Sequence, residues 1–578
     1  MLANCSNLCR LWITRTNRKH ADYKGLGTST PAEAKEYFLS FIQHYRPFRW
    51  EENDGESIDL AFEKTRADDR KKWILDVYDE KSTINVDESD GSVTYGNFVD
   101  NELIHFSNAN NIRALPSVID GLKPSQRKIL HACFKRNLKD EIKVAQLGGY
   151  CAEHTAYHHG EASLHATITS MAQNFVGSNN INLLMPLGQF GTRLMGGDDA
   201  ASPRYIFSHL SPVARLLFPE MDDALLDYKE DDGLSIEPEF FCPVIPLLLV
   251  NGAQGIGTGW STYIPQHNPL DVLNYIRTKL NETDKHASIK PWVKGFAGRI
   301  ADDPSNSGSY ITEGLIEPTS QSTVSITELP VGVWTNDYKA TLVKMMSKGE
   351  IKSFTENHTT TSVSFDVKVN PSKLARFIKG DLHSKFKLRN KLSTRNMNAF
   401  CPNMDIKLFG TPEDIAEAHY RVRFALYADR KSVLESNMEH AAALMRNKAQ
   451  FIEAVSTDQV NLLRGRSSKE NTIGLLKDMG FAPASDLAKI KSNNTVERRR
   501  AISSPAPEDD GKVEPTGMKE YDYLLNMPLS SLTTEKIDAL NEDASKTDAK
   551  LADIQQTTAA EMWHEDLDRL ESHLKDDF

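Results

Sequence analysis

A tyrosine that directly follows an arginine is a candidate for covalent chemistry in this 578-residue sequence. Tyr205 and Arg204 lie in the segment 201–207, after a glycine-rich turn at residues 195–199. A phenol is a weak nucleophile at neutral pH, because its reference pKa is about 10. It needs a base, or cations that stabilise developing phenolate and phosphoryl charge, and Arg204 can supply one. A tyrosine at the amphipathic edge of a core would show the same pair of residues.

Basic side chains cluster in two stretches of the sequence. The first, at 123–143, holds only two acids, and its basic residues are Lys123, Arg127, Lys128, Lys135, Arg136, Lys139 and Lys143. The second has no acid and consists of Lys385, Lys387, Arg389, Lys391 and Arg395. Such clusters are typical of a polyanion site, although a solvated helix face has the same composition.

Three histidines near residue 157 allow two kinds of chemistry. His154 and His158 are one helical turn apart, a spacing that zinc ligands can have. However, the sequence has no HExxH motif, and its six cysteines form no CxxC pair. His158 and His159 precede Gly160 and suit contact with a phosphate, because imidazole can donate a hydrogen bond or carry a proton. A zinc-dependent hydrolase is therefore kept as a distant alternative.

Two glycine-rich segments are candidate binding loops. Residues 24–29, KGLGTS, precede a helix start at Thr30 with Glu33 at the capping-box position. This segment can hold an anion at the helix N-terminus or be a plain turn, and it is not a Walker A loop. Residues 251–260, NGAQGIGTGW, follow a strand-like apolar run at 243–250, and their glycine spacing does not fit a dinucleotide fingerprint. Ile256 on this loop is either a wedge between base pairs or a buried anchor.

The elements that position these residues must belong to several domains, because 578 residues exceed one core. A hydrophobic content of 39% and a charged content of 26% indicate a soluble globular protein. No apolar run is long enough to span a membrane. The net charge of −12 argues against nucleic-acid binding over the whole surface. The scattered cysteines are typical of a reduced intracellular protein.

The second half of the chain predicts a mixed domain and then a long helix. Strand patterns at 322–329 and 361–367 alternate with short helices within 265–400, which indicates an α+β domain. Thr411 caps a helix that reaches 455, on the order of 65 Å long. Residues 472–491 form a small helical unit, and 493–516 form a flexible loop. The expected coiled-coil seam is Ile415, Val422, Leu426 and Val433, and the expected partner stripe is Leu567, Leu570 and Leu574.

Taken in order, the motifs resemble those of type IIA DNA topoisomerases in their eukaryotic topoisomerase II form. They run from residue 24 nearly to the C-terminus: KGLGTS, DGLKPSQRK, YHHGE, AQNFVGSNN, LGQFGTR, SPRYI, NGAQGIGTGW and YDYLLNMPL. The resemblance implies a homodimeric, multidomain α+β fold that acts on double-stranded DNA. Its expected parts are an unmatched stretch 1–20, a Toprim remnant and linker 21–100, a winged-helix domain 101–242, a tower domain 243–400, a coiled-coil helix 401–470, a C-gate 471–540 with the loop 493–516, and a returning helix 541–578.

The resemblance also implies roles for single residues. Tyr205 matches the nucleophile that forms a transient 5′-phosphotyrosyl bond, and Arg204 matches its transition-state stabiliser. Arg113 and His159 match the other residues that polarise the phosphate, and Ile256 matches the residue that intercalates and bends the DNA. The DNA-contacting residues, from the resemblance and the basic clusters together, are Lys123, Arg127, Tyr157, Gln189, Arg70, Lys71, Trp334, Lys387, Lys391 and Arg395.

Magnesium and ATP are the cofactors that the resemblance implies, but the sequence supplies no residues for either. The acidic metal ligands of the family would lie upstream of Lys24, where the chain is acid-free, so no metal ligand is assigned. We expect a fragment without the ATPase region, and a non-catalytic dimeric DNA-binding fragment is the alternative. The expected location is the nucleus. The acid-free first 20 residues resemble a transit peptide, which makes the mitochondrion the second option.

Overall fold

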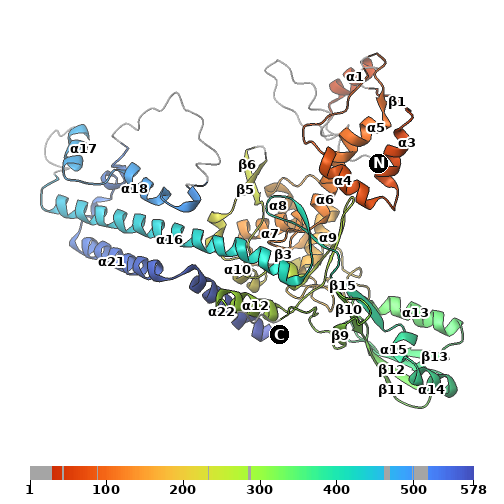
Figure 1. The fold of residues 1–578 in the computed structure, drawn as a ribbon. Helices are drawn as coiled ribbons and strands as arrows, with labels where there is room; N and C mark the ends of the chain where they lie inside the picture. Colours follow the sequence, from red (N-terminus) through yellow and green to blue (C-terminus); the bar gives the residue numbers. More distant parts are fainter. Residues whose placement is uncertain are drawn as a thin grey trace.

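The computed structural model shows a mixed α/β chain with three extensions around a central core (Figure 1). A helical N-terminal unit, a β-rich arm and a long helical arm leave this core in different directions. The prediction of mixed helices and strands is therefore confirmed. The structure describes residues 29–41, 45–87, 89–231, 233–283, 288–460, 469–497, 499 and 519–577.

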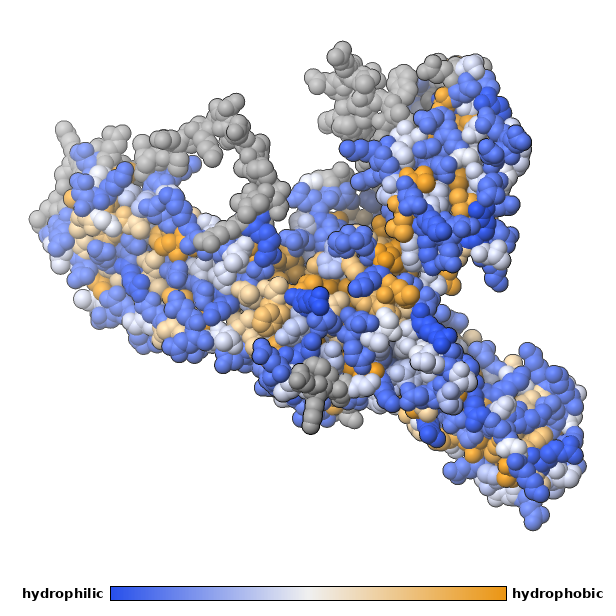
Figure 2. All heavy atoms as spheres, viewed as in Figure 1, coloured by the Kyte–Doolittle hydropathy of each residue, from blue (hydrophilic) through white to orange (hydrophobic). Residues whose placement is uncertain are grey.

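The N-terminal unit begins with the capping box predicted from the sequence. Thr30 Oγ1 accepts from the amide of Glu33, whose carboxylate accepts from the Thr30 amide. Residues 24–28 of the glycine-rich segment lie outside the described residues. Hydrophobic patches are visible on this unit in Figure 2, and Trp50 and Phe62 are among its exposed apolar side chains. Its elements are α1 Pro31–Leu39, β1 Phe48–Arg49, α3 Asp54–Phe62, α4 Ala67–Val77, β2 Val93–Thr94, α5 Tyr95–Phe98, the π-helix Val99–Leu103 and α6 Ile104–Ala114.

The central core holds the largest hydrophobic cluster. Within it the strand-like interpretation of 243–250 is wrong, because Leu247–Asn251 is a short helix. A run that is buried on every side lacks the alternation that separates strand from helix. The elements of the core are α7 Pro124–Arg136, β3 Ile142–Lys143, α8 Val144–His154, α9 Glu161–Ala172, β4 Phe207–Ser208, α10 Pro212–Leu217, the 3-10 helix η4 Glu220–Leu225, β5 Tyr228–Asp231, β6 Leu234–Pro238, α11 Leu247–Asn251, β7 Ala253–Ile256, β8 Ser261–Ile264 and α12 Pro269–Leu280.

The β-rich arm has its own hydrophobic core. A three-stranded sheet in the order β9-β10-β15 leads to a four-stranded antiparallel sheet in the order β11-β12-β14-β13. The predicted strand at 322–329 is confirmed as β12, whereas the one at 361–367 begins only at Phe365. The elements are β9 Arg299–Asp302, β10 Ser309–Glu313, β11 Leu315–Pro318, β12 Thr323–Glu328, α13 Thr335–Ser347, β13 Ser353–Glu356, β14 Phe365–Lys368, α14 Pro371–Lys379, α15 Leu382–Lys385 and β15 Arg389–Ser393.

The helical arm is built on α16, Pro412–Ser456, whose 45 residues confirm the predicted long helix capped by Thr411. Its partner α21 lies alongside it, and α22 returns to the core, where Leu567, Leu570 and Leu574 are buried as predicted (Figure 1). No helix in the described ranges is long and apolar enough to cross a membrane. The remaining elements are β16 Met397–Phe400, β17 Ile406–Phe409, α17 Lys469–Asp478, α18 Ala484–Ser492, α20 Asp522–Leu525, the 3-10 helix Leu529–Ser531, α21 Thr534–Gln556 and α22 Ala559–Asp577.

The seam predicted for α16 is largely wrong. Of its four residues only Ile415 is fully buried, and Val422, Leu426 and Val433 are half-buried. The heptad pattern misses the true inner face, because that face is polar where α16 meets the core. Its buried residues, beside Ile415, include His419, Arg423, Tyr427, Asp429 and Arg430.

Candidate active site

Tyr205 projects from a loop that is fastened to the start of α8. The amides of Val144 and Ala145 donate to the carbonyls of Ile206 and Pro203, at 3.0 and 3.1 Å. Ile206 is buried, and the strand pair β3–β4 follows immediately. The Tyr205 side chain is nevertheless 71% exposed. The backbone is thus fixed while the phenol faces outward, as a nucleophile for a large substrate requires.

The cation expected beside the phenol is present. The guanidinium carbon of Arg204 lies 5.7 Å from the centre of the Tyr205 ring, and the Arg204 side chain is exposed. In this position a guanidinium can stabilise negative charge as it develops on an attacking phenol and on a phosphate.

Glycine-rich loops support the tyrosine loop from below. The amide of Ala201 donates to the carbonyl of Gln189 at 2.9 Å, so Gln189 lies next to the 201–207 segment with its side chain exposed. Gly191 has a φ of +94°, and a Cβ there would lie 2.5 Å from the carbonyl oxygen of Gly197. Only glycine allows the two turns to approach this closely.

Trp334 joins this loop to the β-rich arm. Its ring packs edge-on against Phe175 at 5.8 Å, and a Cβ at Gly196 would lie 2.3 Å from its Nε1. Next to it, a buried ion pair joins Arg193 to Glu328 of β12. Trp334 is half-buried and positions the loop in this structure, so its contact with DNA stays a prediction.

Ile256 lies at the end of β7 and is 78% exposed, so the alternative of a buried anchor is wrong. Its hairpin is pressed against α6. A Cβ at Gly257 would lie 2.1 Å from Asn111 Oδ1, which also accepts from the amide of Thr258 at 2.7 Å. Arg113 is exposed on the same helix, two residues further on. The structure therefore brings Ile256 and Arg113 to one region.

Three further predicted DNA contacts surround this hairpin. Lys123 Nζ donates to the carbonyl of Gln254 at 2.7 Å, and burial lowers the pKa of the Lys123 amine. A Cβ at Gly259 would lie 3.1 Å from the amide nitrogen of Lys71. Arg70 is tied to its own unit, since Nη1 donates to the carbonyls of residues 60 and 63 at 3.0 and 2.7 Å.

The prediction that Arg127 contacts DNA is wrong. Its guanidinium is buried and pairs with the buried carboxylate of Asp120, at 2.7 and 3.0 Å. The same guanidinium also donates to the carbonyl of Leu122 at 3.0 Å. Arg127 faces the inside of α7 because Asp120 needs a counter-charge there, so its role is structural.

Tyr157 and His159 lie together on the loop between α8 and α9. Their ring centres are 5.4 Å apart in an edge-on arrangement, and His159 is exposed. His154 packs its ring on Tyr150 at 4.2 Å, and His158 Nε2 lies 3.2 Å from Asp231 Oδ2. Over the described ranges, no group of three or more His, Cys, Asp or Glu side chains could hold a metal ion. The zinc alternative therefore finds no ligand set in this part of the chain.

The second basic stretch is less charged than its sequence indicates. Lys391 pairs with the carboxylate of Asp303 at 3.0 Å, and Arg395 donates to the carbonyl of Ser307 at 3.0 and 2.8 Å. Lys387 is exposed. The stretch ends beside the Ile256 hairpin, because Tyr263 of β8 donates its amide to the carbonyl of residue 396 at 2.9 Å.

A buried charge network that the sequence did not predict lies where α16 meets the core. Arg423 and Arg430 both reach Asp222 of η4, and Arg430 also donates to Asp566 of α22 at 2.7 Å. The ring of Tyr427 lies between the guanidiniums, 4.3 and 4.4 Å from their central carbons. The spacing of arginine, tyrosine and arginine over one helical face was the available signal.

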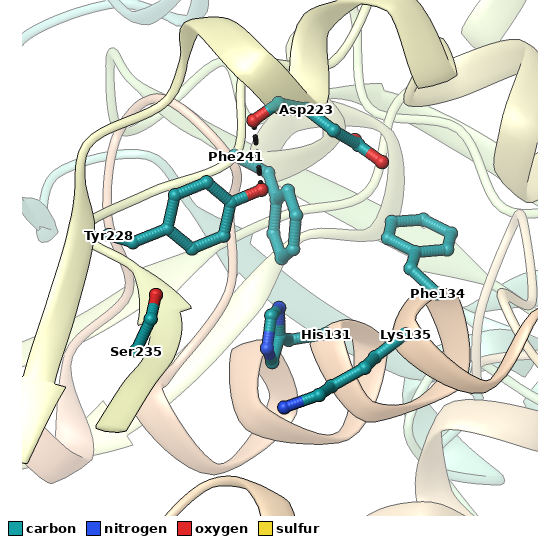
Figure 3. A pocket seen from close by; sticks show the side chains of 7 residues that line it. All are labelled: His131, Phe134, Lys135, Asp223, Tyr228, Ser235 and Phe241. Atoms are coloured by element: carbon teal, nitrogen blue, oxygen red, sulfur yellow. Dashed lines mark hydrogen bonds between the residues drawn. The ribbon is translucent and has the colours of Figure 1, made fainter. Parts of the chain in front are cut away.

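A cavity of about 320 Å³ opens between α7 and the β5–β6 hairpin (Figure 3). Tyr228 spans one wall and donates its hydroxyl to the carbonyl of Asp223 at 2.9 Å. Burial, together with nearby Lys135, Lys128 and His154, lowers the pKa of His131 to about 4. None of the predicted site residues lines this cavity. Its lining residues are His131, Phe134, Lys135, Asp223, Tyr228, Ser235 and Phe241.

Comparison with known proteins agrees with this arrangement. The family profile of DNA gyrase/topoisomerase IV matches residues 113–568, and that of the C-terminal associated domain of TOPRIM matches residues 12–111. DNA topoisomerase 2 of Arabidopsis thaliana is 42% identical over 96% of this chain and 38% of its own length. DNA topoisomerase 2-beta of Homo sapiens is 40% identical over 96% of this chain and 35% of its own length.

A solved structure is similar over nearly the whole chain. It is the crystal structure of the Plasmodium falciparum topoisomerase II DNA-binding, cleavage and re-ligation domain, with a TM-score of 0.78. The identity is 39%, over 96% of this chain and 74% of that one. The chain spans less than half the length of the curated relatives that it matches. With a family profile and relatives that cover nearly all of it, the chain belongs to the type IIA DNA topoisomerases.

Proposed function

We propose that this chain is the breakage-reunion part of a topoisomerase II, which cuts and rejoins double-stranded DNA. The observation that carries the proposal is the exposed phenol of Tyr205 on a loop fixed by backbone hydrogen bonds, with the Arg204 guanidinium 5.7 Å from its ring. The Plasmodium falciparum relative is named for DNA binding, cleavage and re-ligation, which fits this reading.

In this reaction the oxygen of Tyr205 attacks a phosphorus of the DNA backbone. A bond forms between that phosphorus and the phenolic oxygen, and the bond from phosphorus to the 3′ oxygen breaks. The phenolic proton leaves, and the 3′ oxygen gains a proton to become a hydroxyl. Reversal of both changes rejoins the strand, because the phosphotyrosyl bond retains an ester that the 3′ hydroxyl can attack. Arg204, Arg113 and His159 stabilise the charge that develops on the phosphate.

The DNA would be held by the two regions that contain the predicted contacts. Ile256 enters between base pairs and bends the duplex, since an exposed apolar side chain on a braced hairpin suits a wedge. Lys71, Lys123 and the segment 387–396 lie around the same hairpin and meet phosphates. The Tyr157–His159 loop and Gln189 contact the strand near Tyr205.

We further propose the domain assignment and partners that the resemblance implies. A Toprim remnant with its linker occupies 21–100, after an unmatched stretch 1–20. The winged-helix domain is 101–242, and the tower is 243–400. The coiled-coil helix 401–470, the C-gate 471–540 and the returning helix 541–578 then join two copies into a homodimer. Topoisomerase 2 relatives suggest the nucleus, and one Dictyostelium discoideum relative is named mitochondrial.

Magnesium and ATP belong to the proposal only at the level of the family. No described cluster of acidic, histidine or cysteine side chains fits a metal ion, so we derive no step through a metal. We also assign no residue of this chain to ATP. The steps above use only groups that the chain itself supplies.

Formation of a covalent adduct tests the proposal. The chain is incubated with supercoiled DNA and a divalent cation, and protein–DNA linkage is measured after denaturation with detergent. We expect an adduct from the natural chain and none from Tyr205→Phe. Tyr45→Phe is the control, because Tyr45 is also exposed, at 56%, but lies far from this loop in the sequence. An adduct that persists in Tyr205→Phe would contradict the assignment, and DNA binding without any adduct would indicate a non-catalytic binding fragment.

A further inference from the structure

The loop that carries Tyr157 and His159 is held to α8 by main-chain hydrogen bonds at its start. It leaves α8 after His154, and Ala156 adopts a left-handed φ of +47°. The amide of Thr155 donates to the carbonyl of Cys151 at 3.1 Å, and that of Tyr157 donates to the carbonyl of residue 152 at 3.3 Å. A left-handed alanine persists only where the surroundings hold it. We therefore look to the side chains around this loop for the restraint.

A buried ion pair supplies this restraint. Lys128 Nζ of α7 donates to the carbonyl oxygen of Thr155 at 2.5 Å and to Glu237 Oε2 at 2.9 Å. The Lys128 side chain is 16% exposed and that of Glu237 only 4%. Neither charge can be exchanged for water without moving the surrounding structure. The first residue of the loop is thus fixed to β6 through a single ammonium group.

The other strand of the same hairpin reaches the loop as well. Asp231, at the end of β5, places Oδ2 3.2 Å from His158 Nε2. Both side chains are substantially exposed, so this contact is weak on its own. It nevertheless joins the residue directly before His159 to the hairpin. The β5–β6 hairpin therefore meets the loop at Thr155 and again at His158.

We propose that Glu237 is a positioning residue for DNA cleavage, which acts through Lys128 to hold the Tyr157–His159 loop. Neither Glu237 nor Lys128 needs to touch DNA in this role, and the inference rests on the function proposed above. The Glu237 carboxylate fixes the Lys128 ammonium, the ammonium fixes the Thr155 carbonyl, and this carbonyl sets where the loop begins. A loop that starts in the wrong place moves the imidazole away from the scissile phosphate. Displacements of about 1 Å can slow a reaction by a factor of about 100.

The test uses Glu237→Gln, which keeps the shape and an acceptor oxygen but removes the charge. The matched control is Glu239→Gln, because Glu239 is on the same hairpin but pairs with Lys229 at 3.1 Å in an exposed position. We expect Glu237→Gln to slow adduct formation by about tenfold to a hundredfold. DNA affinity should stay unchanged, and Glu239→Gln should behave as the natural chain.

Two readouts separate positioning from a general loss of structure. In a His159→Ala background, Glu237→Gln should slow adduct formation less than twofold further, because the group to be positioned is gone. An equal slowing in both backgrounds overturns the inference. Hydrogen exchange of the amides in 155–160 should become faster in Glu237→Gln and stay unchanged in Glu239→Gln. Unchanged exchange in Glu237→Gln overturns the inference even if the chain forms no adduct, whereas the absence of any Tyr205-dependent adduct in the natural chain contradicts the proposed function instead.

Discussion

Removal of Asp222 is expected to destabilise the junction between α16 and the core. Its carboxylate accepts three hydrogen bonds, one from Arg423 and two from Arg430, at 2.5, 2.7 and 2.7 Å. In Asp222→Ala these two buried guanidiniums lose that partner. Breaking a buried ion pair on one side costs about 3–5 kcal/mol. We expect the lower end, about 3 kcal/mol, because Arg430 keeps Asp566 at 2.7 Å.

Thermal denaturation followed by tryptophan fluorescence measures this loss. Trp563 is buried and stacks on Tyr427 at 5.4 Å, so its emission reports on the network. A loss of about 3 kcal/mol in a domain of about 200 residues lowers Tm by roughly 6–12 °C. Asp568→Ala is the control, because Asp568 pairs with Arg277 of α12 while its side chain is 68% exposed. It should change the stability by less than about 1 kcal/mol.

The pH dependence gives a second check on the same residue. Burial alone would raise the pKa of Asp222, but the charges and hydrogen bonds of Arg423 and Arg430 outweigh it and hold the pKa below its usual value. A carboxyl whose pKa is lowered by folding stabilises the fold above its unfolded pKa of about 3.9. That contribution disappears as pH falls through the folded pKa. The gap between the natural chain and Asp222→Ala should therefore be constant from pH 7 to about 5 and shrink below about pH 4.

Two outcomes would refute this reasoning. One is an Asp222→Ala protein within about 1 kcal/mol of the natural chain, since that would mean that water or local rearrangement replaces the carboxylate. The other is an equal loss in Asp568→Ala, which would show that burial does not decide the effect.

Two further predictions concern the regions around the DNA. Gly257→Ala should reduce DNA bending, measured by energy transfer between dyes at the duplex ends, because its Cβ would lie 2.1 Å from Asn111 Oδ1 and displace the hairpin. Gly149→Ala is the control, since its Cβ would meet nothing within 4 Å, and equal bending in all three proteins contradicts the bracing of the hairpin. Arg127→Ala should cost about 3 kcal/mol by leaving Asp120 buried and unpaired, with no change in the salt dependence of DNA binding. A salt slope lower by about one unit would restore Arg127 as a phosphate contact.

Local sequence signals predicted the helix ends well. Thr411 caps α16 and Thr30 caps α1, each with an acid three residues later that returns a hydrogen bond. A capping box involves only residues within one turn, so the sequence contains the whole interaction. The loop that carries Tyr205 was identified for the same reason, because the motif and its turns are contiguous.

Charge partners that are distant in the sequence were not predictable in this way. The basic stretch at 385–395 contains no acid, yet Lys391 pairs with Asp303, 88 residues away, and Arg389 pairs with Glu313, 76 residues away. These acids lie beside the stretch because β15 pairs with β10 in the folded sheet. A sequence gives the number of charges in a segment, but only the sheet register determines how many remain free for DNA.

The polar face of α16 shows how far this limit reaches. A heptad pattern predicts a helix that packs on another helix, but at its root α16 packs on η4 and α22, each of which presents an acid. Two arginines and two aspartates balance there, so α16, η4 and α22 are fixed to one another without an apolar seam. Tyr228 then ties β5 to η4 through its bond to Asp223, and Glu237 on the paired strand β6 reaches the Tyr157–His159 loop through Lys128. These contacts form a continuous connection from the long helix to the cleavage site. It is a functional coupling only if both ends bias one equilibrium, so Asp222→Ala must also change amide exchange at 155–160.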